Sequence, residues 1–258
     1  MLSLGKVIVI ANQKGGVAKT TTSVNLAASL AEYKQKVLLI DLDPQGNASS
    51  GLGVEKNQIE YSIYDVLVNH VPINKITIKL NQNLHIAPAK VELAGAELEL
   101  VSVISRETRL KNALEEAREQ YDYLIIDTPP SLGLLTLNAL TAADSYLVPI
   151  QCEYYALEGV SQLLNTINLV QKNLNPKLQM EGILMTMYDN RTNLSNQVVD
   201  DVKEAFKDKV FKTIIPRNVR LSEAPSFGQA IIDYDRRSKG AETYLALAKE
   251  VMKNGGKK

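Results

Sequence analysis

Short, continuously apolar runs alternate along the chain with longer segments in which apolar residues recur at helical spacing. Uninterrupted apolar runs are typical of parallel strands buried on both faces, and the wider spacing is typical of amphipathic helices. The pattern predicts strands at Val7–Ala11, Val37–Ile40, Leu84–Ala87, Tyr123–Ile126, Tyr146–Ile150, Gly182–Met185 and Thr213–Ile215. It predicts helices at Thr20–Tyr33, Arg109–Glu119, Leu132–Ala143, Ala156–Leu174, Leu194–Phe206 and Ala241–Met252. The helix at Arg109–Glu119 is charged, and we expect it to face solvent.

Alternating strands and helices indicate an α/β protein with a doubly wound, mostly parallel sheet flanked by helices. No Pro-, Gly- or Ser-rich linker divides the 258 residues, so we expect a single domain over 1–258, with a frayed tail at 253–258. In such sheets, ligands bind outside the carboxyl ends of the strands. We therefore expect functional residues directly after the strands.

The segment after the first predicted strand has the composition of a phosphate-binding loop. It reads Lys14-Gly15-Gly16-Val17-Ala18-Lys19-Thr20-Thr21 and leads directly into a predicted helix. A strand, a glycine-rich loop and a helix in this order present backbone N–H groups and a helix N-terminus to anionic oxygens. Lys19 adds positive charge at the outer phosphates, and the hydroxyl of Thr20 is placed for a Mg²⁺ ion.

Carboxylates follow two further predicted strands. Asp41 and Asp43 alternate at the end of one strand, and Asp127 follows an apolar run at the end of another. A carboxylate in this position is the usual partner of Mg²⁺ in phosphate-loop enzymes. A single Asp at a strand end is more often a turn former or a helix cap. The combination of these strand ends with the loop favours a nucleotide site.

Composition narrows the choice of function. The chain has 29 Lys and Arg against 29 Asp and Glu, so a nucleic-acid-binding face must be local. The single cysteine, Cys152, excludes a disulfide framework and a cysteine-ligated cluster within one chain. The two histidines, His70 and His85, show no metal-ligand spacing. The sequence shows no signal-peptide pattern and no apolar run of ~18–20 residues, so we expect a soluble, cytosolic protein.

The loop departs from the generic pattern G-x-x-x-x-G-K-[ST], because Gln13 takes the first glycine position and Ala18 the last. It resembles instead the deviant variant K-G-G-x-x-K-[ST], in which Lys14 is the signature lysine. Five segments together resemble the ParA family, specifically its short chromosomal Soj type: Asn12–Gly16, Asp41–Asn47, Asp127–Gly133, Gln151–Gly159 and Ile215–Ser226. The resemblance covers Lys6 to Val251.

This resemblance implies a P-loop ATPase that acts as a switch in chromosome or plasmid segregation. In the family, ATP and Mg²⁺ are enclosed by a homodimer that closes face to face and then binds double-stranded DNA without sequence preference. A ParB/Spo0J-type centromere-binding partner stimulates hydrolysis, and the protein works on the nucleoid in the cytoplasm. The implied ATP-binding residues are Lys14, Gly15, Gly16, Val17, Ala18, Lys19, Thr20 and Thr21, with Pro216 and Asn218 on the adenine side.

The resemblance also implies roles for single side chains. Lys14, Lys19 and Asp43 would act in catalysis, with Lys14 reaching the phosphates of the partner subunit and Asp43 orienting the attacking water. Thr20 and Asp127 would hold Mg²⁺, Asp127 through water, and Asp41 would support the site. Arg191 and Arg220 match family arginines associated with DNA binding, and secondary candidates are Arg217, Arg236, Arg237 and Lys203. The alternative is that these six basic residues are ordinary surface side chains or salt-bridge partners.

Other functions could use the same loop. A MinD-like, membrane-cycling ATPase would need a C-terminal amphipathic helix with a basic face. Here the last predicted helix instead carries a core-packing stripe, followed by few lysines: Tyr244, Leu245, Ala248, Val251 and Met252, then Lys253, Lys257 and Lys258. An iron–sulfur reductase ATPase would need cysteines to bind its cluster, and this chain has only Cys152. A further alternative is a metabolic enzyme with the same loop, such as a ligase or a small-molecule kinase. We expect Tyr154 and Tyr155 to pack or to face the dimer.

Ala18 raises one more alternative, a nucleotide-gated DNA-binding scaffold with little hydrolysis. If the loop needs a positive φ at this position, alanine costs on the order of 1 kcal/mol. If it does not, the methyl group still crowds the phosphates or the facing subunit. The hypothesis is that ATP binding is retained while closure or hydrolysis is impaired.

Overall fold

The computed structural model describes residues 4–153 and 158–255. The strands are β1 (Lys6–Ile10), β2 (Val37–Asp41), β3 (Ile78–Lys79), β4 (Leu84–Ala87), β5 (Tyr123–Asp127), β6 (Ser145–Gln151) and β7 (Gln179–Thr186). They form one sheet in the order β3-β4-β2-β5-β1-β6-β7. β3 pairs antiparallel with β4, and the other neighbouring strands pair in parallel.

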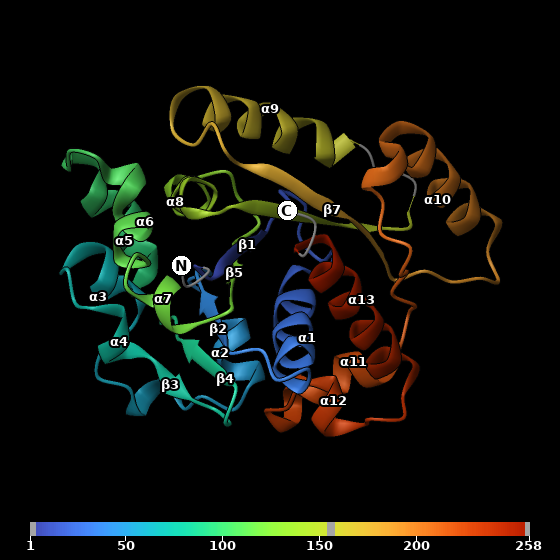
Figure 1. The fold of residues 1–258 in the computed structure, drawn as a ribbon, viewed down its shortest axis with the longest axis horizontal. Coiled ribbons are helices and arrows are strands. Elements are labelled where there is room, and N and C mark those ends of the chain that lie inside the picture. Colours follow the sequence, from blue (N-terminus) through green and yellow to red (C-terminus); the bar gives the residue numbers. More distant parts are fainter. Residues whose placement is uncertain (1–3, 154–157, 256–258) are drawn as a thin grey trace.

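Helices cover both faces of this sheet (Figure 1). The α-helices are α1 (Lys19–Glu32), α2 (Asn47–Gly51), α3 (Ile63–Val68), α4 (Ile73–Ile76), α5 (Leu93–Glu99), α6 (Arg109–Ala113), α7 (Ala117–Gln120), α8 (Leu134–Ala142), α9 (Glu158–Asn173), α10 (Asn193–Phe206), α11 (Val219–Glu223), α12 (Ile231–Tyr234) and α13 (Lys239–Gly255). The 3₁₀ helices are η1 (Lys56–Gln58), η2 (Leu100–Ser102), η3 (Arg106–Thr108), η4 (Lys207–Lys209) and η5 (Ala224–Phe227). The predicted doubly wound α/β fold is confirmed.

The central strands divide their side chains between two hydrophobic cores. In β1, Val7 and Val9 belong to the core under α8 and α9, whereas Ile8 and Ile10 belong to the core under α1 and α13. Successive side chains of a strand point to opposite faces of the sheet, so a strand that is apolar throughout fills both cores. This requirement explains why the parallel strands read as uninterrupted apolar runs.

The carboxyl ends of β2, β5 and β1 lie next to one another. β5 is the middle strand of the three, and Asp127 at its end is in register with Asp41 of β2 and Ile10 of β1. The hydroxyl of Thr128 donates to the carbonyl of Ile10 at 2.8 Å and ties the ends of β5 and β1 together. The strand order thus brings the loop after β1 and the acidic residues of β2 and β5 to one edge of the sheet, where a ligand is expected.

The strand predicted at Thr213–Ile215 is wrong. The chain from 210 to 216 runs beside β7 but forms isolated bridges rather than a continuous ladder. The carboxylate of Glu250, on α13, accepts hydrogen bonds from the backbone N–H groups of Lys212 at 2.9 Å and Thr213 at 2.8 Å. Because a side chain satisfies these two amides, they are not available to β7.

The helix predicted at Arg109–Glu119 is divided into α6 and α7, and it faces solvent on one side only. Leu110, Leu114 and Ala117 recur at helical spacing and are buried. A narrow apolar stripe is enough to anchor one face of a helix, while charged residues of the other face, such as Lys111, Glu115 and Glu119, stay exposed. The pattern also missed the short helices within 47–76 and 93–102 and the two-residue strand β3.

The C-terminal helix packs as predicted. α13 lies beside α1 on one face of the sheet (Figure 1), and Tyr244, Ala248 and Val251 are fully buried there. The helix continues to Gly255, past the predicted start of the frayed tail at 253. None of the helices in residues 4–153 and 158–255 combines the length and the apolar character that a membrane crossing needs.

Two expectations fall outside the described part of the chain. Tyr154 and Tyr155, expected to pack or to face the dimer, lie between its two ranges. Lys257 and Lys258 of the predicted tail lie beyond the second range.

Candidate nucleotide-phosphate site

The loop between β1 and α1 turns through two left-handed residues. Gly16 has φ 73° and Ala18 has φ 67°, and Ala18 is also the N-cap of α1. The side chain of alanine offers no capping oxygen, so the first N–H groups of α1 face the loop without a side-chain cap. An uncapped N-terminus of a long helix beside exposed glycines is a good environment for phosphate oxygens. The loop geometry is therefore suited to an anion, and phosphate binding by its residues stays a prediction.

Lys19 is buried and points back across the loop. Its Nζ donates to the carbonyl oxygen of Lys14 at 3.0 Å. Burial lowers the pKa of Lys19, and the charges of Asp127 and Asp43 oppose that shift. A partly desolvated ammonium group gains more from an incoming phosphate than a fully hydrated one does. The side chain of Lys14 forms no hydrogen bond or ion pair with any residue in the described ranges, so this cation is available at the loop.

Asp127 carries a fully buried carboxyl group at the end of β5. The hydroxyl of Thr20 donates to its Oδ2 at 2.8 Å, and the hydroxyl of Ser23 donates to its Oδ1 at 2.7 Å. Burial, followed by the nearby charge of Asp41, raises the pKa of Asp127, whereas the two hydroxyls lower it. Both donors come from the first five residues of α1, so the carboxylate of β5 fixes the orientation of the helix that follows the loop.

The other two predicted carboxylates lie on the β2 side of the site. Oδ2 of Asp41 accepts from the hydroxyl of Ser49 at 2.7 Å and from its backbone N–H at 2.8 Å. Burial raises the pKa of Asp41, against the lowering effect of the Ser49 hydrogen bonds. Asp43 is also buried, and its Oδ1 accepts from the backbone N–H of Gln45 at 2.9 Å. Asp41 therefore holds α2 to β2. The second carboxylate oxygen of Asp43 accepts no hydrogen bond from the described residues.

Sequence reasoning missed two residues of this cluster. Ser23 lies three positions after Thr20 on α1, so it shares the helix face that meets Asp127 and could have been inferred from that spacing. Ser49 reaches Asp41 only because Gly46, at φ 62°, turns the chain back onto β2. No local pattern in the sequence reveals that turn.

The donor set fits Mg²⁺ held together with a phosphate. Thr20 and Asp127 place hard oxygen donors side by side, and Mg²⁺ prefers oxygen ligands. No group of three His, Cys, Asp or Glu side chains in the described ranges is arranged to hold a metal by protein ligands alone. Mg²⁺ commonly takes one or two protein oxygens and completes its shell with water and substrate phosphates. The arrangement is therefore suited to a metal that arrives with a nucleotide.

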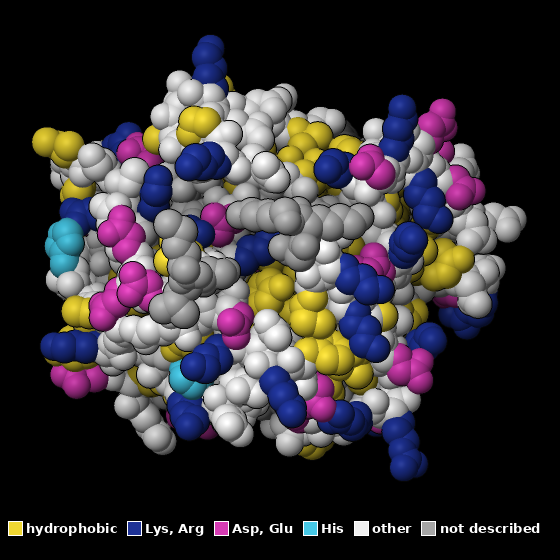
Figure 2. Space-filling view, in the orientation of Figure 1, with side chains coloured by type: hydrophobic (Ala, Val, Ile, Leu, Met, Phe, Trp, Pro, Cys, Tyr) yellow, Lys and Arg dark blue, Asp and Glu magenta, His cyan; other side chains and the backbone are white. Residues whose placement is uncertain are grey.

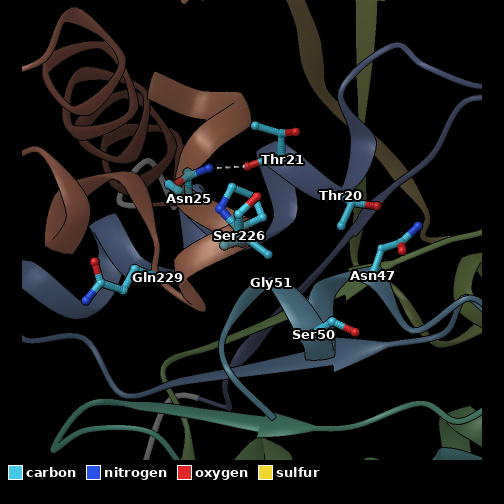
Figure 3. Close-up of a pocket in the computed structure, with 11 residues that line it drawn as sticks. Thr20, Thr21, Asn25, Asn47, Ser50, Gly51, Ser226 and Gln229 are labelled. Carbon is cyan, nitrogen blue, oxygen red and sulfur yellow. Dashed lines mark hydrogen bonds between the residues drawn. The ribbon is translucent and has the colours of Figure 1, made fainter. Parts of the chain in front are cut away.

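A pocket of about 370 Å³ opens beside the loop (Figure 3). Thr20 and Thr21 form one wall, and the rest comes from α1, α2 and the segment 224–229: Val24, Asn25, Asn47, Ser50, Gly51, Ala224, Pro225, Ser226 and Gln229. The predicted adenine contacts, Pro216 and Asn218, do not line it. The side-chain oxygen of Asn218 instead caps α11 by accepting from the N–H of Arg220 at 2.9 Å. Their adenine role stays a prediction.

The predicted DNA-binding arginines are paired with acidic neighbours. Arg191 forms a two-pronged contact with Asp189, at 2.8 Å through Nε and 2.6 Å through Nη2. Arg220 pairs with Glu223 at 2.9 Å and approaches Asp235 at 3.7 Å. Pairs this exposed contribute little stability and are weakened by salt, so a nucleic-acid phosphate can replace the carboxylate.

The secondary DNA candidates differ from one another. Arg236 pairs with Glu32, which is the ordinary surface role. Arg217, Arg237 and Lys203 form no ion pair with another residue in 4–153 or 158–255.

Comparisons with known proteins agree with this geometry. A family model described as an AAA domain matches residues 5–180. The chain is 64% identical over 253 residues to the sporulation initiation inhibitor protein Soj of Bacillus subtilis, covering 98% of this chain and 100% of that protein. It is 58% identical over 252 residues to the chromosome partitioning protein ParA of Myxococcus xanthus, covering 97% of this chain and 89% of that protein. A solved structure of cobyrinic acid a,c-diamide synthase from Mycobacterium smegmatis, with bound ATP analogue and magnesium, matches with TM-score 0.87 at 39% identity, covering 98% of this chain and 97% of that one.

The left-handed backbone of Ala18 gives a first prediction. Ala18→Gly should raise the free energy of unfolding of the nucleotide-free protein by about 0.5–1 kcal/mol, because glycine adopts a positive φ without a Cβ clash. Urea unfolding followed by circular dichroism measures the change. Ala246→Gly, at an exposed helical position of α13, is the matched control and should lower stability by about 1 kcal/mol. A loss of stability in both variants would contradict the strain at Ala18.

The hydrogen bond between Ser49 of α2 and Asp41 of β2 gives a second prediction. Ser49→Ala should lower the free energy of unfolding by about 2 kcal/mol, because it removes the hydroxyl donor to buried Asp41 and the acceptor for the N–H of Ala89. Ser50→Ala, on the same helix, removes only a bond to the carbonyl of Gly46 and should cost about 0.5 kcal/mol. Equal losses in the two variants would show that Ser49 has no special role.

Proposed function

Because the chain belongs to the ParA/Soj family of chromosome-partitioning ATPases, we propose that it is an ATP-dependent dimerising switch. In its ATP state it binds double-stranded DNA without sequence preference, and ATP hydrolysis releases it. It drives chromosome or plasmid segregation on the nucleoid together with a ParB/Spo0J-type centromere-binding partner. The observation that carries this proposal is the contact of Thr20 with Asp127, which joins the loop to the buried carboxylate at the sheet edge.

The nucleotide we propose is ATP with Mg²⁺. The M. smegmatis structure, with ATP analogue and magnesium, supports this choice, as does the oxygen pair of Thr20 and Asp127. The loop from Lys14 to Thr21 binds the phosphates, and Lys19 exchanges its contact with the Lys14 carbonyl for them. The Mg²⁺ ion neutralises phosphate charge when it is bound. Asp127 meets the ion through water, because its oxygens are already occupied by Thr20 and Ser23.

Closure of two subunits over the nucleotide explains the exposed part of the loop. Gly15 and Gly16 lie at the surface, and the Lys14 side chain has no partner among the described residues. A cation kept free beside a phosphate site can serve phosphates bound to a second copy. We assign to Asp43 the role of orienting the attacking water, because it is buried and one of its carboxylate oxygens accepts no hydrogen bond from the described residues.

DNA binding would come from local positive charge on a chain of zero net charge. Arg191 and Arg220 are the principal contacts we propose, and the secondary ones are Arg217, Arg237 and Lys203, which form no ion pair within the described ranges. Contacts to phosphates give affinity that falls steeply with salt and depends little on sequence. A dimer doubles the patch, so nucleotide binding and DNA binding become linked equilibria.

The alternatives are less well supported. A MinD-like membrane cycle would need the apolar stripe of α13 to be exposed, and that stripe is buried against α1. A metabolic role is suggested by the name of the M. smegmatis structure, but the two partition relatives are more similar in sequence, at 64% and 58% against 39%.

A scaffold with little hydrolysis stays a second candidate, because the strained φ at Ala18 is observed. The steady-state turnover and ATP affinity of Ala18→Gly beside this chain separate it from an active switch. Faster turnover at similar ATP affinity is expected if the strain impairs hydrolysis, and equal values would remove this candidate.

A third prediction concerns Asp43. Asp43→Ala should bind ATP and stay dimeric on DNA while its hydrolysis falls by about 10²-fold or more, because the group that orients water is gone. Filter binding of labelled ATP and phosphate release measure the two properties. Glu55→Ala, at an exposed carboxylate directly before η1, serves as the control. Unchanged turnover in Asp43→Ala would remove Asp43 from its assigned role.

A fourth prediction concerns the arginines. Arg191→Ala with Arg220→Ala should lose DNA binding but keep ATP-dependent dimerisation, because the ion-pair partners of both side chains, Asp189, Glu223 and Asp235, lie outside the phosphate loop. Lys111→Ala with Lys172→Ala removes the same charge from exposed positions elsewhere and should leave DNA affinity nearly unchanged. Fluorescence anisotropy with a labelled duplex, measured over a salt series, tests both. Intact DNA affinity in the arginine variant would refute the patch.

A further inference from the structure

The hydroxyl group of Thr186 connects the end of β7 to the phosphate loop. Thr186 is the last residue of β7 and is fully buried. Its hydroxyl donates to the carbonyl oxygen of Val17, inside the loop, at 3.2 Å. Within residues 4–153 and 158–255, no other hydrogen bond joins β7 to loop positions 14–18. One side chain therefore links two parts of the chain that are distant in sequence.

This hydrogen bond holds one particular peptide group of the loop. The carbonyl of Val17 and the N–H of Ala18 belong to the same trans peptide, so they point in opposite directions. Because Thr186 draws the carbonyl toward β7, the Ala18 N–H is directed away from β7. That N–H donates to no group in the described part of the chain. It is therefore left for a phosphate oxygen.

A phosphate on the loop would strengthen the contact with Thr186. Hydrogen bonds from hydroxyl groups are commonly about 2.7–2.8 Å long, so the 3.2 Å contact of Thr186 with Val17 is a loose one. Hydrogen bonds at the two ends of one peptide group polarise it and reinforce each other. When the Ala18 N–H binds a phosphate, the Val17 carbonyl becomes a better acceptor for the Thr186 hydroxyl.

The chain leaves the sheet directly after Thr186. Met187 has φ 52°, a left-handed value that turns the backbone out of β7. Tyr188 then joins a second segment, because its N–H donates to the carbonyl of Ile215 at 3.1 Å and its carbonyl accepts from the N–H of Arg217 at 2.9 Å. The position of β7 at Thr186 therefore influences both segments.

Both segments carry arginines that we propose as DNA contacts. Arg191 follows Tyr188 and is held by Asp189, and Arg220 follows Arg217 at the start of α11. We call residues 187–192 and 213–220 the arginine segments. They lead into α10 and α11, and Lys and Arg side chains gather on the surface over α10, α11 and α13 (Figure 2).

We propose that Thr186 is a positioning residue that couples phosphate binding at the loop to the order of the arginine segments. This inference rests on the proposed function, in which nucleotide state controls DNA binding. A phosphate on the loop strengthens the Thr186 hydrogen bond, and this bond in turn holds the start of the arginine segments. By linkage, DNA that orders these segments also favours nucleotide binding. The coupling acts within one subunit and adds to the closure of the dimer.

Hydrogen–deuterium exchange of the full chain, followed by mass spectrometry, tests this coupling. The ligand is ADP with Mg²⁺, because ADP brings phosphates to the loop while the proposed function expects it to leave the protein monomeric. In the parent, saturating ADP should slow exchange in the arginine segments about threefold, since their opening must then break a stronger bond. Thr186→Val is nearly isosteric but has no hydroxyl. It should lose this slowing at saturation and bind ADP about fivefold more weakly.

Two further variants separate coupling from a merely structural role. Thr186→Ser keeps the hydroxyl and should retain the slowing by ADP. Thr141→Val removes a buried hydroxyl that donates to the carbonyl of Leu137 at 2.7 Å within α8, and it should respond to ADP as the parent does. A merely structural Thr186 would lower the free energy of unfolding in Thr186→Val but leave the effect of ADP on exchange unchanged.

Three results would overturn the inference. They are an absence of slowing by ADP in the parent, equal slowing in Thr186→Val and the parent, or a loss of slowing in Thr186→Ser or Thr141→Val. ATP-dependent DNA binding of the parent is measured in parallel by anisotropy. If that binding is absent while the exchange results hold, the proposed switch is wrong and the coupling stands. If the binding is present while the exchange results fail, the coupling alone is wrong.

Discussion

The carboxyl group of Asp127 is removed from solvent, and the nucleotide end of the molecule is organised around it. A buried charge costs several kcal/mol unless hydrogen bonds and opposite charges compensate it. Here the compensation comes from Thr20 and Ser23 on α1 and from the charge of Lys19. The same contacts that make burial tolerable fix the phosphate loop against β5. The stability of this region and the position of the phosphate loop therefore depend on the same hydrogen bonds, those of Thr20 and Ser23 to Asp127.

The backbone of the loop adds a second constraint. Gly16 and Ala18 are both left-handed, and only the glycine accepts this conformation without cost. The strain at Ala18 lies at the N-cap of α1, directly before Lys19. A change in the backbone of the loop would therefore move Lys19 and Thr20. Through the hydrogen bond of Thr20, it would also alter the contact with Asp127. These contacts connect the phosphate loop to the buried end of β5.

The sequence predicted the features that local pattern controls. The phosphate loop, the apolar parallel strands and the strand-end acids Asp41, Asp43 and Asp127 are each set by neighbouring residues, and the parallel order then brings them together. Other features depend on distant contacts. Glu250 interrupts the predicted strand at Thr213–Ile215 from a helix far along the chain, and Ser49 reaches Asp41 only through a left-handed turn. The pairing of Arg191 with Asp189 is close in sequence, but its geometry required the structure.

In the function we propose, nucleotide state controls dimerisation and DNA binding together. The most direct measurement is the oligomeric state and the DNA affinity of the same preparation without nucleotide, with ADP, with ATP and with a non-hydrolysable ATP analogue, all with Mg²⁺. We expect a monomer with weak DNA binding in the first two conditions, and a dimer with tight, salt-sensitive DNA binding when the analogue is present. Equal DNA affinity and an unchanged oligomeric state in all four conditions would contradict it.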